Sequence, residues 1–431
     1  MNYYAKALSF VSIVFLVLAL TSCNRGRNIH EALYVSNLRE TLVADAEEHN
    51  LIETIPAYED FPTLSIIMYD GISPFVDKEL WIDSSFSLDS THSNWRFEGI
   101  TGSVSGHADS TWLTEGSENK RSLRISFDEA RPVTGSDASH TDWVLLANHF
   151  DLSLLRGHVA FELAKILGHT GFVPFSQFVH LYVNDEYMGV YQLVDDVSVA
   201  NGRVELSFSP NPVWSEYLIW RDMHDQGYEI LFPASYLHNG HAQYVYQFIV
   251  NVSDAIQAEN WELIQTLIDV DSFVNFYIQA EFLSDIAINS VFLHIRGQDH
   301  RRRLFFGPVW DFDLAAGNDI RRFDTEFPFV ALRHYWFHHL IAIPEFRNNV
   351  ADRWNELRDN EIVQFITDIE NKARQWRPDF ERNFERHPLT DIRSIYEPRV
   401  FGEIDTFMGH VDFLTDWLMR RAYWMDGYIN N

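Results

Sequence analysis

The sequence predicts an α+β protein whose first part is rich in strands and whose second part is helical. Between residues 61 and 200, short apolar runs alternate with polar residues at a period of two, which is typical of half-buried strands. From about residue 201, apolar residues recur every three to four positions over longer stretches, which is typical of helices packed on a core. Strands followed by helices favour an α+β fold over alternating α/β units.

The first part contains the strand pattern at several places and one helical pattern. We expect strands at residues 63–68, 80–88 and 120–127, a buried segment at 143–147, and a hairpin formed by 178–183 and 187–194. Asp151 is a candidate N-cap for a helix, and Gly168 is a candidate stop signal for the same helix.

The second part begins with helical spacing at residues 248–268 and 271–284, where Asp271 is a candidate N-cap. Two short strands are expected at 289–295 and 304–309, and mainly helices from 329 to 431. We therefore divide the chain into a signal segment (1–22), a polar tether (23–60), a sheet-rich lobe (61–200) and a helix-rich lobe with the candidate catalytic motifs (201–431).

The first residues have the pattern of a secretory signal peptide. Lys6 is followed by an apolar run over residues 7–20, which is shorter than the roughly 20 residues of a spanning helix. The run ends in Leu20-Thr-Ser-Cys23, which resembles a bacterial lipobox. Acylation of Cys23 would give stable anchoring. We expect an extracytoplasmic protein of the bacterial cell envelope, attached to a membrane through lipidated Cys23. The alternative is an ordinary secretory signal or one anchoring helix, with a cysteine that is there by chance.

Composition narrows the classes of partner. The chain has 62 acidic and 33 basic side chains, and its net charge is -29 at pH 7. A nucleic-acid-binding protein needs a basic face to neutralise phosphates, so we expect no nucleic-acid partner. Intrinsic disorder is excluded because 46% of the residues are hydrophobic and 15% are aromatic. The single cysteine excludes an intramolecular disulfide and a cysteine-based zinc site.

Two polar stretches in the second part carry the strongest candidate chemistry. One is residues 281–289, around Asp285, and the other is residues 307–318, around Asp311 and Asp313. In an extended segment, side chains two residues apart point the same way, so Asp311 and Asp313 can face one cation. Carboxylate oxygens suit Mg2+ or Mn2+, which bind one or two carboxylates together with substrate phosphates. The alternative is that these carboxylates cap helices and turns.

Several stretches lie in an order that matches one known family. They are Ser110-Thr-Trp, Lys120-Arg-Ser-Leu-Arg124-Ile, Trp143 to Asn148 with Asp151 and Arg156, Leu181 to Tyr191, Glu281 to Asn289, Gly307-Pro-Val-Trp-Asp311-Phe-Asp313, and Pro344-Glu-Phe-Arg347. The chain resembles the CotH kinase family, the spore-coat-type secreted kinases, from about Pro62 to the C-terminus. The resemblance implies an atypical protein-kinase-like fold with a sheet-rich N-terminal lobe and a helical C-terminal lobe.

The same resemblance implies a metal-dependent kinase that transfers the γ-phosphoryl group of ATP to Ser or Thr of an exported protein, with Mg2+ or Mn2+. Asp285 would orient the acceptor hydroxyl as the catalytic residue. The metal ligands would be Asn289, Asp311 and Asp313. The candidates for nucleotide binding are Lys120, Gly106, Ser110, Arg124 and Arg156. For Arg156, a structural carboxylate is the alternative partner.

The segment from Ser105 to Ser110 departs from the family's phosphate loop. The family usually has Arg-Gly-x-Gly-Asn-Ser, whereas this chain has Ser105-Gly-His-Ala-Asp-Ser110. Backbone amides cradle phosphate best where glycine permits close approach. A second interpretation is therefore a catalytically degenerate CotH-like scaffold that acts as a binding or assembly module in the envelope. A third, from another class, is a surface glycosidase or glycan-binding protein, because aromatic residues and carboxylate pairs are frequent.

His334 and His338 are one helical turn apart, a spacing that zinc sites also use. The Glu of a His-Glu-x-x-His motif is missing, and the residues between them are aromatic. We therefore expect packed histidines here rather than a metal site.

Overall fold

The computed structural model describes residues 61–430 except for gaps at 70–74, 76, 92–94, 108–109, 114–119, 134–137, 169–171, 223–226, 235–239, 286–289 and 393–396. The predicted signal segment and tether, with Cys23, lie outside the described residues, and so does Asn289. In the described part, no helix is both long enough and apolar enough to cross a membrane.

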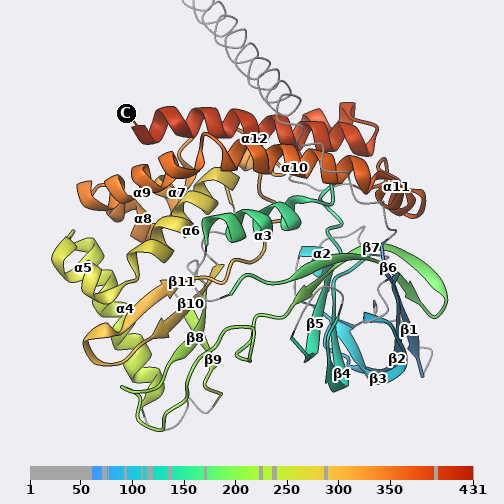
Figure 1. Ribbon diagram of the computed structural model, residues 1–431, viewed down its shortest axis with the longest axis horizontal. Coiled ribbons are helices and arrows are strands. Elements are labelled where there is room, and N and C mark those ends of the chain that lie inside the picture. The colour runs from blue at the N-terminus through green and yellow to red at the C-terminus, as the bar shows by residue number, and fades with distance from the viewer. Residues whose placement is uncertain are drawn as a thin grey trace, which may run out of the picture. The chain divides into compact units, whose positions relative to one another are not determined.

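Strands of the N-terminal part form a closed barrel in the order β1-β2-β3-β4-β5-β7-β6 (Figure 1). Their bounds are β1 Thr63–Met68, β2 Ile82–Asp89, β3 Phe97–Gly106, β4 Leu123–Arg131, β5 His140–Leu146, β6 Ser176–Val183 and β7 Glu186–Asp195. Neighbouring strands are antiparallel except β1 and β6, whose parallel pairing closes the barrel. Ile66, Phe86 and Ile125 belong to the buried cluster of the barrel strands. Closure pairs every strand on both sides and leaves no free edge.

A second sheet lies in the C-terminal part, with the antiparallel order β11-β10-β8-β9. Its strands are β8 Tyr217–Asp222, β9 Gly227–Phe232, β10 Ser290–Arg296 and β11 Arg303–Phe306. The strands predicted at 289–295 and 304–309 correspond to β10 and β11. The prediction missed β8 and β9, because a short run with few polar residues has the same pattern in a buried helix and a strand.

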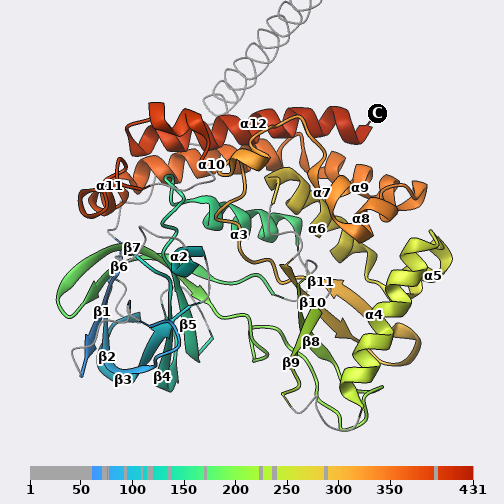
Figure 2. The ribbon, with the colours of Figure 1, turned by 180° about the vertical axis from the view of Figure 1, so that it is seen from behind.

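The described helices beyond the short α2 (Ser110–Leu113) cover most of the remaining chain. They are α3 Arg156–Leu167, α4 His241–Gln257, α5 Trp261–Leu267, α6 Val270–Leu283, α7 Phe329–Arg333, α8 Tyr335–Leu340, α9 Pro344–Leu357, α10 Glu361–Gln375, α11 Arg377–Arg386 and α12 Phe407–Asn430. In Figures 1 and 2, α10 and α12 run side by side, and α3 and α6 lie below them. Residues 272–283 of α6 are all buried, so this helix forms the centre of the helical part. The α+β prediction, with a sheet-rich first part and a helical second part, is confirmed.

Several predicted boundaries were wrong for local reasons. Helix α3 begins at Arg156 rather than directly after Asp151; the Asp151 carboxylate accepts the backbone N–H groups of Ser153 (3.0 Å) and Arg156 (2.7 Å). Helix α6 is capped by Asp269, not Asp271, since the Asp269 side chain accepts the Ser272 N–H at 2.9 Å. The pattern at 248–268 is two helices, α4 and α5, separated by residues 258–260.

A buried ion pair joins α6 to α12. Arg421 and Glu281 are both fully buried, and Arg421 Nη2 lies 2.6 Å from Glu281 Oε1. The same carboxylate accepts backbone N–H groups at the start of α7, from Phe329 (2.8 Å) and Val330 (2.9 Å). One acidic side chain therefore holds together α6, α7 and α12.

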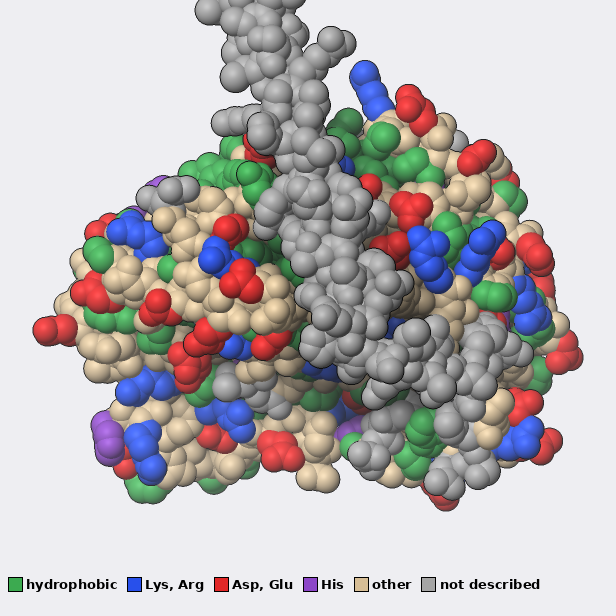
Figure 3. Space-filling view, turned by 45° about the horizontal axis from the view of Figure 1, so that its top comes forward, with side chains coloured by type: hydrophobic (Ala, Val, Ile, Leu, Met, Phe, Trp, Pro, Cys, Tyr) green, Lys and Arg blue, Asp and Glu red, His purple; other side chains and the backbone are tan. Residues whose placement is uncertain are grey.

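On the face shown in Figure 3, Asp and Glu side chains are interspersed with Lys and Arg, and neither sign forms one broad patch. The excess of acidic residues in the sequence is therefore spread out on this face. Exposed charges that lie apart on a protein surface are screened by salt, and their interactions contribute little to the stability of the fold.

We predict that Arg421→Met destabilises the protein by about 3–5 kcal/mol, because it leaves the Glu281 carboxylate buried without its cation. Urea unfolding measures this change. The double variant Glu281→Gln/Arg421→Met should recover part of the loss, since the buried charge is then gone. The matched control is Arg420→Met, which removes an exposed arginine one residue earlier on α12. Equal effects of Arg420→Met and Arg421→Met would contradict the prediction.

We also predict that buried histidines weaken the fold in acid. Burial is the largest cause that lowers the pKa of seven described histidines: below its ordinary value for His140, to about 4 for His107, His294, His387 and His410, and to about 3 for His158 and His334. A histidine with a lowered pKa in the folded state contributes stability above the unfolded pKa of 6.5, and loses it as pH falls toward the folded pKa.

His158 is a suitable residue for testing this effect, because its ring is buried between Phe178 and Trp376. Between pH 7 and pH 5, the urea midpoint of His158→Phe should fall less than that of the parent chain. The exposed His300 provides the control, His300→Gln, whose midpoint should follow the parent. A parallel pH dependence for His158→Phe and the parent would disprove the assignment.

Candidate functional site

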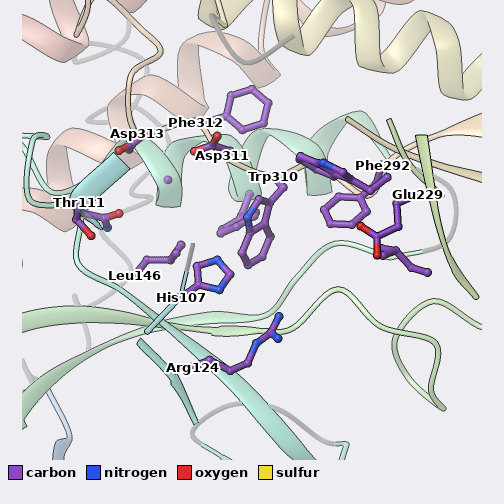
Figure 4. Close-up of a pocket in the computed structure, with 15 residues that line it drawn as sticks. His107, Thr111, Arg124, Leu146, Glu229, Phe292, Trp310, Asp311, Phe312 and Asp313 are labelled. Atoms are coloured by element: carbon purple, nitrogen blue, oxygen red, sulfur yellow. The ribbon is translucent and has the colours of Figure 1, made fainter. Parts of the chain in front are cut away.

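A cavity of about 400 Å3 lies where the barrel, α3, the second sheet and the segment before Asp313 meet (Figure 4). The residues that line it are His107, Thr111, Arg124, Leu146, Asn148, Gly157, Phe161, Trp220, Glu229, Leu231, Phe292, Trp310, Asp311, Phe312 and Asp313. They come from β3–α2, β4, β5, α3, β8, β9, β10 and the loop after β11. Segments far apart in the sequence therefore form one site.

The cavity has a polar side and an aromatic side. Figure 4 shows Asp311, Asp313 and Thr111 on one side, and Phe292 and Glu229 on the other, with Trp310 between them. Such a combination of an apolar slot and a few polar groups is typical of a small-molecule site. An aromatic slot suits a flat ring, and paired carboxylates suit a cation.

The segment 311–318, here called the acidic loop, is fixed from several directions. Its Ala316 N–H donates to the carbonyl of Leu283 at the end of α6 (2.6 Å). The Asn318 amide donates to the Asp313 carbonyl (2.7 Å) and the Phe150 carbonyl (3.0 Å). Asp311 itself has φ 68°, a conformation that non-glycine residues adopt rarely and mainly at functional sites. The loop is therefore held in a set conformation before any ligand arrives. The expectation of an extended segment was wrong here: β11 ends at Phe306, and Asp311 and Asp313 both line the cavity from a loop.

Arg156 is part of this support. It is 1% exposed, and each of its three nitrogens donates inside the protein. Nη1 donates to the Asp151 carboxylate and to the Ser153 hydroxyl (3.1 Å), and Nε and Nη2 donate to the carbonyls of Ala315 (3.0 Å) and Ala316 (3.2 Å). The structure thus places Arg156 with the structural carboxylate, and its guanidinium holds the acidic loop instead of facing the cavity.

Lys120 also lies away from the described cavity wall. It precedes β4, is 1% exposed, and its Nζ lies 5.5 Å from the centre of the Tyr191 ring. Burial lowers its pKa to about 7, and the nearby Asp151 carboxylate offsets part of that effect. A nucleotide in the cavity would not meet this amine in the present arrangement, so its nucleotide-binding role stays a prediction.

The predicted phosphate loop begins at the end of strand β3. Gly106 ends β3, and its N–H donates to the Lys78 carbonyl (2.9 Å). A Cβ at Gly106 would meet the Trp112 ring and would lie 2.7 Å from the Lys78 Cα, so close packing explains why glycine occupies this position. Ser110 begins α2, and its side chain is outside the described residues.

Arg124, by contrast, lines the cavity as the nucleotide-binding prediction requires. It lies on β4 opposite Ser105 of β3, and its Nη2 is 3.5 Å from the Asp196 carboxylate. A second cavity, also about 400 Å3, adjoins the first and shares His107, Arg124 and Trp310 with it. Its wall includes residues 196–199, which directly follow β7.

Asp285 follows the end of α6. Its N–H donates to the Ala280 carbonyl (3.0 Å), and its side chain is 3% exposed. It is not among the described residues that line the first cavity. The Leu283–Ala316 hydrogen bond nevertheless brings the chain around Asp285 next to the acidic loop. The structure therefore brings Asp311, Asp313 and Arg124 to one cavity, and Asp285 is not among the described residues that line it.

Sequence reasoning missed several residues of the cavity. His107 lies in the segment that aligns with the family's phosphate loop, where it is one of the residues that depart from the family's pattern. Glu229 lies on β9, a strand that the sequence did not predict, so no signal indicated it. Trp310 precedes Asp311 within a recognised motif, and an aromatic residue next to a candidate metal carboxylate is a signal for the wall of a planar-ligand site.

The donor set of the acidic loop fits a magnesium-like ion that is bound jointly with a substrate. Among the described residues, no group of three or more His, Cys, Asp or Glu side chains could hold a metal ion alone. Two carboxylates on one cavity wall match the usual manner of Mg2+, which completes its shell with water and phosphate oxygens. Asp311 and Asp313 would supply the protein ligands.

Of the histidine pair at the start of α8, His334 is packed as expected, whereas His338 is exposed. His334 is fully buried and accepts the N–H of Phe337 at the helix start, at 3.5 Å. The His338 Nδ1 pairs with the Ala331 carbonyl at 3.1 Å. These contacts account for both side chains as parts of the α7–α8 turn.

We predict that Gly317→Ala destabilises the acidic loop by about 1–3 kcal/mol. Gly317 has φ 75°, and an added Cβ would lie 2.6 Å from an atom of the Trp417 ring. Urea unfolding, followed by tryptophan fluorescence, measures the loss. Gly402→Ala is the control, because a Cβ there meets nothing within 4 Å. If both variants unfold at the parent midpoint, the loop is not constrained as described.

Comparison with known proteins places these features in a family. A search of curated proteins finds no match. The family description "CotH kinase protein" matches residues 110–425, which begin at α2 and contain α3, the second sheet, the acidic loop and nearly all of α12. The match covers well over half of the chain, and it includes the motifs that resembled this family in the sequence. The chain belongs to the CotH kinase family.

Proposed function

We propose that the protein is a CotH-like kinase that transfers the γ-phosphoryl group of ATP to Ser or Thr of an exported protein, with Mg2+ or Mn2+. Membership of the CotH kinase family implies kinase activity and the use of ATP. The observation that carries the proposal is the cavity wall that contains both Asp311 and Asp313. It faces barrel residues, among them Arg124, in a cavity with an aromatic side (Figure 4).

The charges of the two walls are complementary to a metal–polyphosphate. The acidic loop offers two carboxylates, which would attract a divalent cation but would repel a bare phosphate. The barrel wall offers Arg124 and His107, and Lys78 acts on His107 from nearby. A polyphosphate with its cation would satisfy both walls at once. The aromatic side, with Trp310 and Phe292, would hold the base.

Phosphoryl transfer needs mainly positioning and charge stabilisation. A bound Mg2+ or Mn2+ would neutralise the charge that develops on the transferred group. Asp311 and Asp313, with Asn289, would hold the metal, and Asp285 would orient the acceptor hydroxyl. The hydrogen bond between Leu283 and Ala316 keeps the chain near Asp285 and the acidic loop in register. Glu229, at the aromatic side, would accept from a sugar hydroxyl.

The kinase-like division into two lobes is part of this proposal. The barrel, which ends at Asp195, would correspond to the N-terminal lobe, and the part with α6 and α12 to the helical lobe. Residues 196–199, which line the second cavity, would then link the lobes beside the nucleotide. We also propose that Cys23 carries a lipid that anchors the protein to a membrane of the bacterial envelope, where it meets exported substrates.

The second candidate function is a degenerate CotH-like scaffold that binds or assembles envelope proteins. A specific observation favours it: the amides of Gly106 and His107, where the family has its phosphate loop, are already bonded within the protein. Family membership gives no support to the glycosidase interpretation. The two remaining candidates differ in one measurable property, phosphoryl transfer.

We predict that the full-length chain transfers label from γ-labelled ATP to protein in the presence of Mn2+. Asp311→Asn should reduce the rate at least about a hundredfold, because the metal loses a charged ligand that acts in the transition state. Asp185→Asn is the control, since Asp185 lies in the exposed β6–β7 turn at φ 64°, which asparagine tolerates well. Nucleotide binding without any transfer by the parent would establish the scaffold instead.

A further inference from the structure

In the segment that replaces the family's phosphate loop, the backbone donors of Gly106 and His107 are in use. The Gly106 N–H donates to the Lys78 carbonyl at 2.9 Å, and the His107 N–H donates to the Ser122 carbonyl at 3.0 Å. A backbone cradle for phosphate needs amides that point at the ligand with no other acceptor. These two amides cannot serve without breaking hydrogen bonds to the barrel and its neighbouring loop.

Space is also closed beside Gly106. The position that a Cβ would occupy is already in contact with the Trp112 ring and lies within 2.7 Å of Lys78. A phosphate oxygen, which is larger than a hydrogen atom, cannot approach the backbone from that side. A phosphate bound beside Gly106 and His107 must therefore be met by side chains.

Among the described side chains of residues 105–110, His107 projects into the site. It lines both adjoining cavities, and its ring meets the Trp310 ring edge-on at 6.0 Å between centres. Trp310 immediately precedes Asp311, so His107 lies across the cavity from the start of the acidic loop. Figure 4 shows the imidazole between Leu146 and Trp310, with Arg124 on the same barrel wall.

The charges around His107 favour an anion. Arg124 lies on the neighbouring strand, where its Cα partner is Ser105, and Lys78 lies beside the loop; both act on the imidazole. Burial and these two cations lower the pKa of His107 to about 4, so at neutral pH the ring is uncharged and carries one N–H donor. A neutral donor between two cations can approach a phosphate oxygen without a buried charge of its own.

We propose that His107 contacts the phosphoryl groups of the nucleotide through its ring N–H, in place of the backbone amides of a glycine-rich loop. The ligand class is a nucleoside di- or triphosphate, and the inference rests on the proposed nucleotide-dependent function. His107 binds together with Arg124 on the barrel wall, while Asp311 and Asp313 face the cation from the other wall. The altered sequence of the loop then replaces phosphate binding by backbone amides with phosphate binding by side chains.

The test measures how much each phosphate adds to affinity. The full-length chain is titrated with adenosine, AMP and ADP in Mg2+ by calorimetry, for the parent, His107→Ala, His107→Gln and the control His300→Ala. His107→Ala should weaken ADP binding about tenfold, as expected for one hydrogen bond to a charged group. Adenosine binding should stay within about twofold of the parent, which also shows that the variant is folded. His107→Gln should retain more ADP affinity than His107→Ala, because its amide can still donate.

Two results would overturn the inference and leave the proposed function intact. One is an equal loss for adenosine and ADP in His107→Ala, which would make His107 a base contact or a structural residue. The other is ADP affinity in His107→Ala equal to that of His300→Ala. A parent chain that binds none of the three ligands would remove the proposed function and the inference together.

Discussion

The buried Arg156 guanidinium is the interaction on which the site depends. It joins Asp151, at the barrel end, to the carbonyls of Ala315 and Ala316 in the acidic loop, more than 150 residues later in the chain. A buried arginine is costly unless all its donors are satisfied, and here each nitrogen has a partner. The planar guanidinium group fixes the directions of its hydrogen bonds as well as the position of its charge. The loop that carries Asp311 therefore has one arrangement relative to α3.

The second organising constraint is the separation of charge across the cavity. Among the described residues that line the first cavity, the carboxylates belong to the acidic loop and to Glu229 at the aromatic side, whereas Arg124 and His107 lie on the barrel wall. The Asp196 carboxylate, which lines the adjoining cavity, lies 3.5 Å from Arg124 and offsets part of its charge. In a chain with net charge -29, an anionic ligand gains little from the protein as a whole. Local arrangement must therefore supply the attraction, through the barrel cations and a metal that arrives with the ligand.

Much of the architecture was predictable because it follows from the local spacing of apolar and polar residues. Alternation placed β1, β6 and β7, and the apolar periodicity of α6 identified the central helix. The failures also have local causes. Asp151 has the residue type of an N-cap, yet its carboxylate bonds to Ser153 and Arg156 in an irregular turn, and the helix starts later. The sequence pattern alone could not distinguish the strand β8 from a buried helix.

The sequence by itself determined the family motifs, the order of strands before helices, and the carboxylate pair of the acidic loop, because these depend on residue type and spacing. Only the tertiary structure decided which candidates line one cavity. Arg124 and Asp311 line the cavity, whereas Arg156 is buried in hydrogen bonds to the protein itself, and Lys120 is buried near the Tyr191 ring without a hydrogen-bond partner among the described residues. The physical reason is that a buried cation goes to whichever fixed acceptor is near, and in Arg156's case the acceptors come from chain segments that only folding brings within reach.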